Sequence, residues 1–253
     1  IHGSDYAAIQ QAAREAGVTL HALTQFAWHK LMHTYTRDEQ TLVGTTVSGR
    51  ALPVSGIDKS VGLYINTLPL MVDWDTPSVR EQLHAIETQV AALNEYSYVD
   101  LVSLQRDGKR LFHSLLVFEN YPEGSNIGSE ALEFSYRAGL EKTDYPLGLI
   151  AYTKQDTLHL RLQFDTTLLT AEKAERLLMQ LQLILTQLPE NMDQPHAALS
   201  LLSSAEYQTI VYDWNKTDKA YPFDKTIHQL FEEQVKRTPD AIAVVFDDEQ
   251  FTY

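Results

Sequence analysis

Two kinds of hydrophobic repeat, one typical of helices and one typical of strands, alternate along residues 1–188 and limit the fold more than any other feature. The helical repeat is clearest after Thr76, a predicted N-cap, and Pro77, which suits the first helical position. Apolar residues then recur at steps of three and four, so one face of this helix must be buried. These residues are Val79, Leu83, Ile86, Val90 and Leu93.

The strand repeat is clearest in two places. Residues 41–48 are rich in β-branched side chains, and in residues 158–164 leucines alternate with other residues. Residues 147–153 and 158–164 are predicted to pair as a hairpin across the turn 154–157.

The apolar run 61–74 contains Pro69, which lacks the N–H that an inner strand needs, so this run is predicted to be an edge strand or an irregular crossing segment. Helices over 4–16, 20–35 and 170–188 complete the pattern, with Ser4 and Thr19 as caps of the first two, as do strands over 111–119 and 132–136 joined by a turn at 120–124. This alternation predicts an α/β fold, a two-layer sandwich of one mixed sheet covered by helices.

The chain changes character after Leu188. Residues 189–202 are predicted to be a linker, because the segment from Pro189 to Pro195 is polar and bounded by prolines. Residues 203–253 then show two capping-box patterns, at Ser203 with Glu206 and at Thr226 with Gln229, followed by strands over 241–246 and 250–253. This last part is too small to bury a core alone, and the chain opens on Ile1, so we expect a piece of a longer protein.

Composition excludes several classes of function. Among 253 residues there is no cysteine, which excludes disulfides, thiolate nucleophiles and cysteine-bound metals and favours a reducing cytoplasm. The 20 Lys and Arg are scattered among 34 Asp and Glu, and a net charge of −14 makes nucleic acid and anionic lipid poor partners. No apolar run approaches the roughly 20 residues of a membrane span, so we predict no membrane partner.

No complete catalytic or metal motif is recognisable. His29 and His33 have the spacing of a metal pair, but Lys30 follows where a zinc protease has its glutamate, so a surface or packing role is predicted for both histidines. The segments 44–49 and 124–129 contain glycines without the spacing of a dinucleotide or phosphate loop and are interpreted as turns. No serine has the surroundings of a hydrolase nucleophile.

Polar residues also occur in two segments that are otherwise apolar, and none of the motifs above explains their presence there. Asn66 and Thr67 lie inside the run 61–74, and Ser48-Gly49-Arg50 ends the first predicted strand. Because a polar group among apolar residues needs a partner, the side chains of Asn66 and Thr67 either bond neighbouring backbone at a chain crossing or face a cavity. Both alternatives stay open at this point.

These residues carry a resemblance to a known family. The run Val61–Leu70 resembles the I/V-G-x-F-V-N-T signature of nonribosomal peptide synthetase condensation domains, and residues 44–50 resemble the G-x-x-x-x-G-R segment that precedes it. Residues 115–122 resemble a later strand of the same family. Residues 230–244 and 251–253 resemble the start of an adenylation domain, which follows a condensation domain in such synthetases.

The resemblance implies that residues 1–188 are the second subdomain of a condensation domain with a chloramphenicol-acetyltransferase-like fold, and residues 203–253 the truncated start of an adenylation domain. Two such subdomains enclose a tunnel, where an amide bond forms between thioesters that carrier proteins deliver on phosphopantetheine arms. The family's H-H-x-x-x-D-G motif belongs to the first subdomain and is absent here. We therefore assign no catalytic residue and predict that this chain alone is inactive.

The family pattern implies a candidate tunnel wall formed by Ser48, Gly49, Arg50, Gly62, Asn66 and Thr67. It also implies three partners, namely peptidyl carrier proteins, the first condensation subdomain and the adenylation domain. No cofactor or metal is expected on this segment, since ATP and Mg²⁺ would bind the rest of the adenylation domain.

Two departures from the family pattern leave alternatives open. Met71 stands where the family often has arginine, and residues 94–100 follow the family's H-Q-D-Y-P-F-E pattern only loosely. An epimerisation-type relative therefore remains an alternative. So does a non-catalytic segment that only joins condensation and adenylation domains.

Overall fold

The computed structural model describes residues 1–57, 59–105, 108–119, 143–220 and 222–253. It divides into two compact units, Ile1–Ser203 and Ser204–Tyr253, each of which is described by itself. The predicted turns at 120–124 and 124–129 and the predicted strand 132–136 lie outside the described residues.

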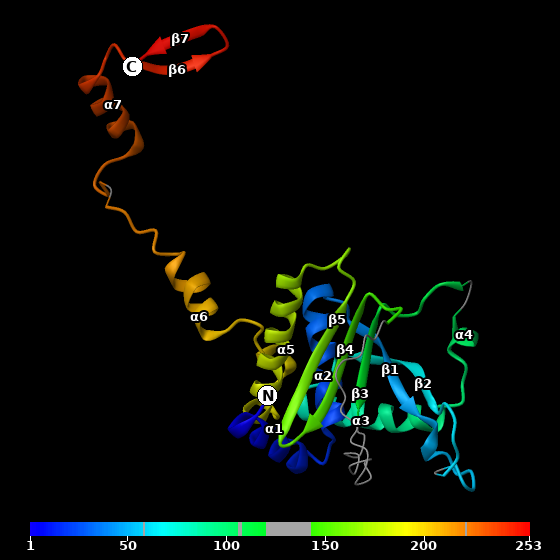
Figure 1. Cartoon of the computed structure of the whole chain (residues 1–253). Helices are drawn as coiled ribbons and strands as arrows, with labels where there is room; N and C mark the ends of the chain where they lie inside the picture. Colours follow the sequence, from blue (N-terminus) through cyan, green and yellow to red (C-terminus); the bar gives the residue numbers. More distant parts are fainter. Residues whose placement is uncertain (58, 106–107, 120–142, 221) are drawn as a thin grey trace, which may run out of the picture. The chain divides into compact units, whose positions relative to one another are not determined.

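The first unit is built on one five-stranded mixed sheet with the order β2-β1-β3-β4-β5 (Figure 1). The two outer pairs, β1 with β2 and β4 with β5, are antiparallel, whereas β3 runs parallel to both β1 and β4. The strands are β1 (Gln40–Ser48), β2 (Ile65–Asp73), β3 (Ser114–Glu119), β4 (Leu147–Lys154) and β5 (Thr157–Phe164). The predicted mixed sheet is confirmed.

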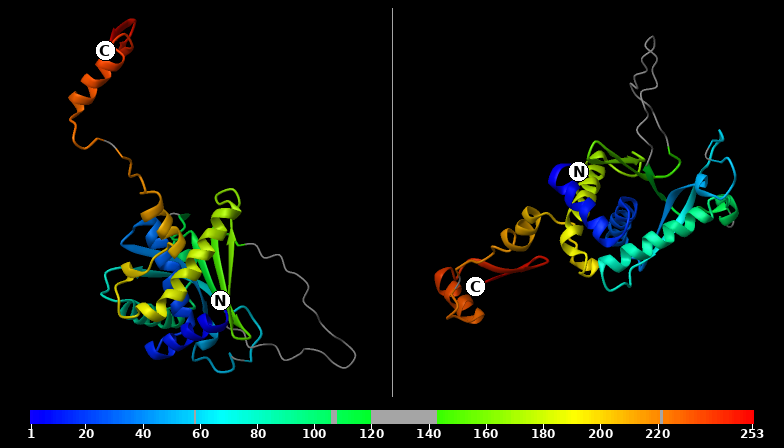
Figure 2. Two further views of the ribbon diagram at one scale, coloured as in Figure 1. Left: turned by 90° about the vertical axis from the view of Figure 1, so that its left-hand side faces the viewer. Right: turned by 90° about the horizontal axis from the view of Figure 1, so that it is seen from below.

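Helices cover the sheet as the hydrophobic repeats predict (Figure 2). They are α1 (Gly3–Ala16), α2 (Leu20–Thr36), α3 (Val79–Glu95) and α5 (Ala171–Asn191), with the short helices η1 (Gly49–Ala51), α4 (Leu101–Leu104) and η3 (His196–Ala198). The core joins the apolar stripes of α1, α2, α3 and α5 to the inner face of the sheet, and Phe26, Trp28 and Leu116 are fully buried there. The two-layer α/β fold is thus confirmed.

Individual residues account for the position of β2 at the sheet edge and for the turn between β4 and β5. β2 is an edge strand, which confirms the expectation from Pro69. β4 and β5 are joined by a tight turn whose central residues, Gln155 and Asp156, have φ values of 47° and 55°, as the favoured two-residue hairpin turns require. Gly44 lies within β1, so the interpretation of residues 44–49 as a turn was wrong for all but its last residue.

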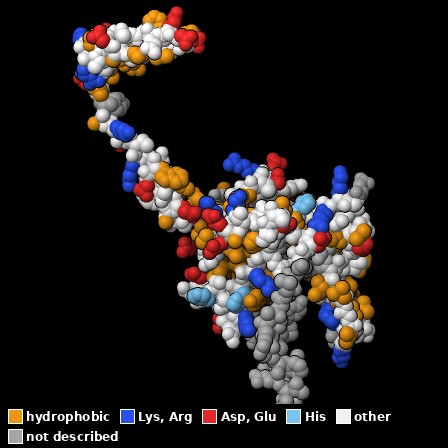
Figure 3. All heavy atoms as spheres, turned by 45° about the horizontal axis from the view of Figure 1, so that its top comes forward, with side chains coloured by type: hydrophobic (Ala, Val, Ile, Leu, Met, Phe, Trp, Pro, Cys, Tyr) orange, Lys and Arg blue, Asp and Glu red, His pale blue; other side chains and the backbone are white. Residues whose placement is uncertain are grey.

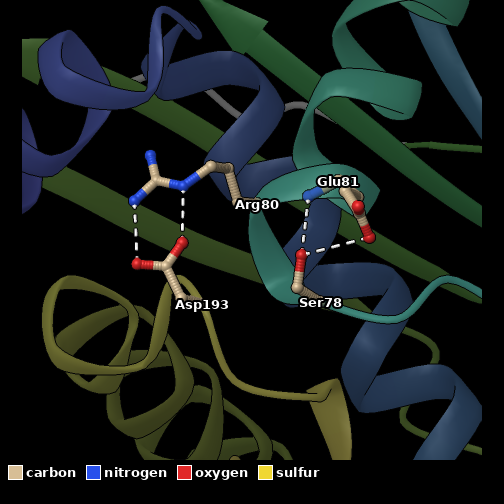
Figure 4. Close-up of polar contacts among 4 residues, drawn as sticks. All are labelled: Ser78, Arg80, Glu81 and Asp193. Carbon is tan, nitrogen blue, oxygen red and sulfur yellow. Dashed lines mark hydrogen bonds and ion pairs between the residues drawn. The ribbon is translucent and has the colours of Figure 1, made fainter.

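Two predicted helix starts were wrong. α3 begins after Ser78, whose Oγ accepts a hydrogen bond of 3.3 Å from the backbone N–H of Glu81 (Figure 4). Thr76 instead donates its hydroxyl to Gln82 at 2.5 Å, so Pro77 precedes the helix rather than opening it. α1 begins at Gly3, one residue before the predicted cap Ser4. Thr19 caps α2 as predicted, and Gly17 ends α1 in a left-handed conformation.

The predicted linker, residues 189–202, belongs to the first unit, and part of it packs into the core. α5 continues through Pro189 to Asn191, and Met192 and Leu199 are buried in the core. The backbone N–H of Val79 donates to Gln194 at 2.9 Å, and Arg80 forms an ion pair of 2.7 Å with Asp193 (Figure 4). Pro189 lacks the N–H for one helical hydrogen bond, and α5 ends two residues after it.

The second unit comprises α6 (Ser204–Tyr207), η4 (Gln208–Asp213), α7 (Ile227–Arg237) and the antiparallel pair β6 (Ile242–Phe246) and β7 (Glu249–Thr252). The predicted capping box of Thr226 and Gln229 is confirmed. Large apolar side chains remain exposed on both α7 and the hairpin, among them Ile227, Phe246 and Phe251. This unit buries little core, as its length predicts.

On the face drawn in Figure 3, Lys and Arg side chains are scattered among Asp and Glu side chains. Within the described ranges, no helix is both long and apolar enough to cross a membrane.

Candidate functional site

The predicted site residues of β1 and β2 meet at one end of this strand pair. Asn66 lies opposite Val47, and Thr67 lies opposite Thr46. Ser48 is the last residue of β1 and is exposed, and Gly49 and Arg50 follow in η1. Gly62 is exposed in the loop that leads into β2. Three of the six residues therefore lie on the paired strands, two follow in η1, and the loop carries the sixth.

Asn66 is half-buried, and its side chain binds backbone. Its Nδ2 donates to the carbonyl oxygens of Ser97, at 2.9 Å, and of Val99, at 2.6 Å. Its Oδ1 accepts the N–H of Thr67 at 2.8 Å. Of the two alternatives that the sequence left open for Asn66, backbone bonding at a chain crossing is the one observed.

Arg50 holds the loop between β1 and β2. Its guanidinium donates to the carbonyl oxygens of Ile57, at 2.9 Å, and of Ser60, at 3.3 Å, and lies 4.6 Å from the centre of the Tyr64 ring. The hydroxyls of Ser60 and Tyr64 share a hydrogen bond of 2.5 Å. A planar guanidinium can bind two carbonyls and stack on an aromatic ring at once, so arginine suits this position.

Gly49 lies between the contacts of Asn66 and those of Arg50. Its N–H donates to the carbonyl of Tyr64 at 2.7 Å, and a Cβ placed on it would lie 3.6 Å from the Ser97 Oγ. That hydroxyl is buried and has no hydrogen-bond partner among the described residues. The Ser97 loop therefore lies against both Gly49 and Asn66.

Sequence reasoning missed the partners of these residues. Ile57, Ser97 and Val99 contribute main-chain carbonyls, which leave no signature in a sequence. Tyr64 was the one detectable partner, because it occupies the aromatic position of the Val61–Leu70 motif.

The loops around the site expose apolar side chains. Val61 is fully exposed, Leu63 is 89% exposed and Tyr98 is 71% exposed. Isolated apolar side chains are common on surfaces, but several on adjoining loops are typical of a surface that another molecule covers.

The histidine pair lies away from this site, in packing roles. His29 is buried, and its Nδ1 lies 2.8 Å from the Thr41 Oγ1. Its pKa is lowered to about 3 by burial. The Nδ1 of His33 lies 2.7 Å from the carbonyl of Asp38, and its ring stacks on Trp74. In the described part of the chain, no group of three or more histidines and carboxylates could hold a metal ion.

Residues 2–211 match the condensation domain family. This chain belongs to that family. The matched residues extend past the predicted subdomain end at Leu188, reach into the predicted adenylation segment 203–253, and stop before residues 230–244, which carry the resemblance to an adenylation domain. They contain all six candidate site residues.

Large synthases are similar to this condensation domain. The chain is 39% identical to N-(5-amino-5-carboxypentanoyl)-L-cysteinyl-D-valine synthase of Amycolatopsis lactamdurans, over 93% of this chain and 7% of that synthase. It is 36% identical to a linear gramicidin synthase of Brevibacillus parabrevis, over 97% of this chain and 5% of that synthase. The chain thus spans less than a tenth of these relatives' length.

Solved structures share the fold of this condensation domain. A holo four-domain nonribosomal peptide synthetase bound to AMP and glycine matches 98% of this chain, and this chain covers 20% of it, with a TM-score of 0.74 and 17% identity. The first condensation domain of the CDA synthetase matches 79% of this chain, and this chain covers 46% of it, with a TM-score of 0.64 and 14% identity.

Replacing Arg50 tests whether its side chain holds the loop between β1 and β2 in place. Lysine keeps the charge but not the planar group, so Arg50→Lys should release the 52–64 loop and speed its cleavage by chymotrypsin. Global stability should change by about 1 kcal/mol or less, because Arg50 is exposed. The control is Lys59→Ala, which removes a charge from the same loop. Equal cleavage of wild type and Arg50→Lys would contradict the assigned role.

Proposed function

We propose that the chain is part of a nonribosomal peptide synthetase and helps to form an amide bond between substrates held on carrier proteins. The observation that carries this proposal is the condensation domain match over residues 2–211. The similar proteins support it, since the relatives are named as synthases, among them bacitracin synthase 1 of Bacillus licheniformis, and one similar solved structure is named as a nonribosomal peptide synthetase. The proposed site of action is the cytoplasm.

In this reaction an amine nitrogen attacks the carbonyl carbon of a thioester. The C–N bond forms, the C–S bond breaks, and the proton lost by the amine ends on the released pantetheine thiol. The thioester is already activated, so holding the two reactants together can supply roughly 7 to 11 kcal/mol of the barrier reduction. A base or a charge-placing histidine adds to this.

Within that reaction, the chain's proposed role is to form tunnel wall and acceptor-side surface. The candidate wall residues are Ser48, Gly49, Arg50, Gly62, Asn66 and Thr67, at the end of the β1–β2 pair. The reacting histidine would come from an H-H-x-x-x-D-G motif in a first subdomain. The side chains of Asn66 and Arg50 bind backbone carbonyls, which is compatible with this division of labour.

The proposed partners follow from the same assignment. Two carrier proteins would bring their phosphopantetheine arms to the tunnel, and a first condensation subdomain would close it. Residues 203–253 would begin an adenylation domain whose remaining part binds ATP and Mg²⁺. The exposed apolar side chains of α7 and β6 support this last assignment, because such a surface needs a covering partner.

A scaffold role is the second candidate. It is favoured by Asn66, whose side-chain donors both bind backbone rather than pointing free into a cavity. In that case the chain would only join its neighbours, and an epimerisation-type relative would share the same contacts.

The test uses the longer synthetase that contains this chain. With both carriers loaded, we expect amide formation. It should stop when the H-H-x-x-x-D-G motif of the first subdomain is changed, while adenylation of the acceptor continues. A synthetase that loads its acceptor normally yet forms no amide would overturn the proposal. Racemisation of the carrier-bound residue without amide formation would assign the epimerisation alternative instead.

A further inference from the structure

We infer that Asn66 is a positioning residue that fixes Tyr98 beside the candidate tunnel wall. The inference rests on the proposed function and adds a residue and a role to it. It starts from the position of Tyr98, which lies between the two residues, Ser97 and Val99, whose carbonyls Asn66 binds.

The hydrogen bonds of Asn66 leave little of it free to bind substrate. A carboxamide has two N–H donors, and each of them has a carbonyl partner here. Its oxygen accepts the N–H of Thr67. A substrate could take one of the donors only by releasing a carbonyl of the loop, so direct binding would disturb the Tyr98 backbone.

The loop Tyr96–Asp100 depends on these bonds. α3 ends at Glu95, and short-range hydrogen bonds follow, from Tyr96 N–H to the Leu93 carbonyl at 3.1 Å, from Ser97 N–H to the Asn94 carbonyl at 3.3 Å and from Val99 N–H to the Tyr96 carbonyl at 2.9 Å, while Asp100 caps α4. Among the described residues, the hydrogen bonds that join this loop to β2 come from Asn66. Two bonds from one side chain therefore fix the backbone on both sides of Tyr98.

The loop is packed as well as hydrogen-bonded. Ser97 is buried, and its Oγ lies against Gly49. The Tyr98 side chain, by contrast, is 71% exposed, and its ring centre lies 6.5 Å from that of Tyr96. A buried anchor with an exposed aromatic side chain next to it is suited to holding a group against another molecule.

The chemistry of Tyr98 fits the substrates of the proposed reaction. A phenol offers an apolar face and a hydroxyl that donates or accepts, and a pantetheine arm with its aminoacyl group offers alkyl chain and amides in turn. We assign Tyr98 to the wall that contacts the aminoacyl arm, and Asn66 to the placement of Tyr98. Misplacing a positioning group by about 1 Å can cost roughly 100-fold in rate.

The first experiment measures hydrogen exchange of the backbone amides in the 253-residue chain. Asn66→Asp keeps the shape but loses both donors, and we expect amide exchange in residues 97–101 to rise by about tenfold or more. The matched control is Asn94→Asp, because the Asn94 side chain bonds only a carbonyl of its own helix, that of Val90. Unchanged exchange in Asn66→Asp would overturn the inference. Asn66→Ala serves as a second variant should the carboxylate unfold the sheet end.

The second experiment measures single-turnover amide formation in the longer synthetase. Asn66→Asp and Tyr98→Ala should each slow this step by about tenfold without changing acceptor loading, and the double variant should be no slower than the worse single variant. Additive losses, or a Tyr98→Ala variant with the wild-type rate, would overturn the inference. Absence of amide formation in the wild-type synthetase would instead reject the proposed function, while hydrogen exchange would still decide whether Asn66 holds the loop.

Discussion

Acidification from pH 7 to pH 4 is expected to remove several kcal/mol from the free energy of unfolding of the first unit. Burial lowers the pKa of His29 to about 3. Burial also lowers the pKa of His21 to about 4, although the nearby charge of Glu87 opposes this shift. In the unfolded chain both imidazoles titrate near 6.5.

The direction of the effect follows from proton binding. Above pH 6.5 both states carry neutral imidazoles and stability is unaffected, whereas below it the unfolded chain binds protons that the folded chain does not. Stability therefore falls as pH drops from about 6.5 toward the folded pKa values, by at most roughly 1.4 kcal/mol per pH unit for each histidine. Since domains are stable by about 5–15 kcal/mol, the loss should be a large fraction of the free energy of unfolding.

Urea unfolding followed by tryptophan fluorescence between pH 7 and pH 4 measures this slope. His29→Gln keeps a polar, neutral side chain and should flatten the slope, although it lowers stability at pH 7. His84→Gln is the control, because His84 is exposed on α3. Equal acid slopes in wild type and His29→Gln would contradict the assignment to His29.

Gly44→Ala is expected to destabilise the first unit by about 1–3 kcal/mol, whereas Gly49→Ala should have little effect. Both glycines belong to the family segment at residues 44–50, but their surroundings differ. A Cβ on Gly44 would overlap the ring of Phe112, which is buried and stacks on Tyr145 with ring centres 5.3 Å apart. A Cβ on Gly49 would make only ordinary contacts, the nearest at 3.4 Å.

Urea unfolding at pH 7 distinguishes the two variants. A second change, Phe112→Leu, provides a branched side chain that can move aside, so the double variant Gly44→Ala/Phe112→Leu should lose less stability than the two single losses added together. Equal stabilities of Gly44→Ala and Gly49→Ala would contradict the overlap with Phe112.

The sequence predicted the elements of the fold better than their ends. The edge position of β2 followed from a single missing N–H at Pro69, and the start of α7 followed from the capping pair Thr226 and Gln229. The start of α3 was wrong because Thr76 and Ser78, on either side of a proline, can both cap, and only the contact of Thr76 with Gln82 distinguishes them.

The location of the candidate site could be predicted from the sequence, but the hydrogen-bond partners of its residues could not. Family resemblance pointed to Asn66 and Arg50, and the need of buried polar groups for partners gave the two alternatives for Asn66. The partners of Asn66 are the carbonyls of Ser97 and Val99, which lie 31 and 33 positions further along the chain. Contacts of this kind depend on how α3 returns to the sheet, which no local pattern encodes.

The packing of residues 192–199 within the first unit has a consequence for recombining proteins that carry this domain. Met192 and Leu199 fill the core, and the backbone of Val79 and the side chain of Arg80 bind this segment. If a domain swap placed its junction before Leu199, one hybrid protein would have a cavity in its core. The other would carry an apolar segment with no matching core to pack on. A junction between Ser203 and Ser204, where the two units divide, keeps every one of these contacts within one parent.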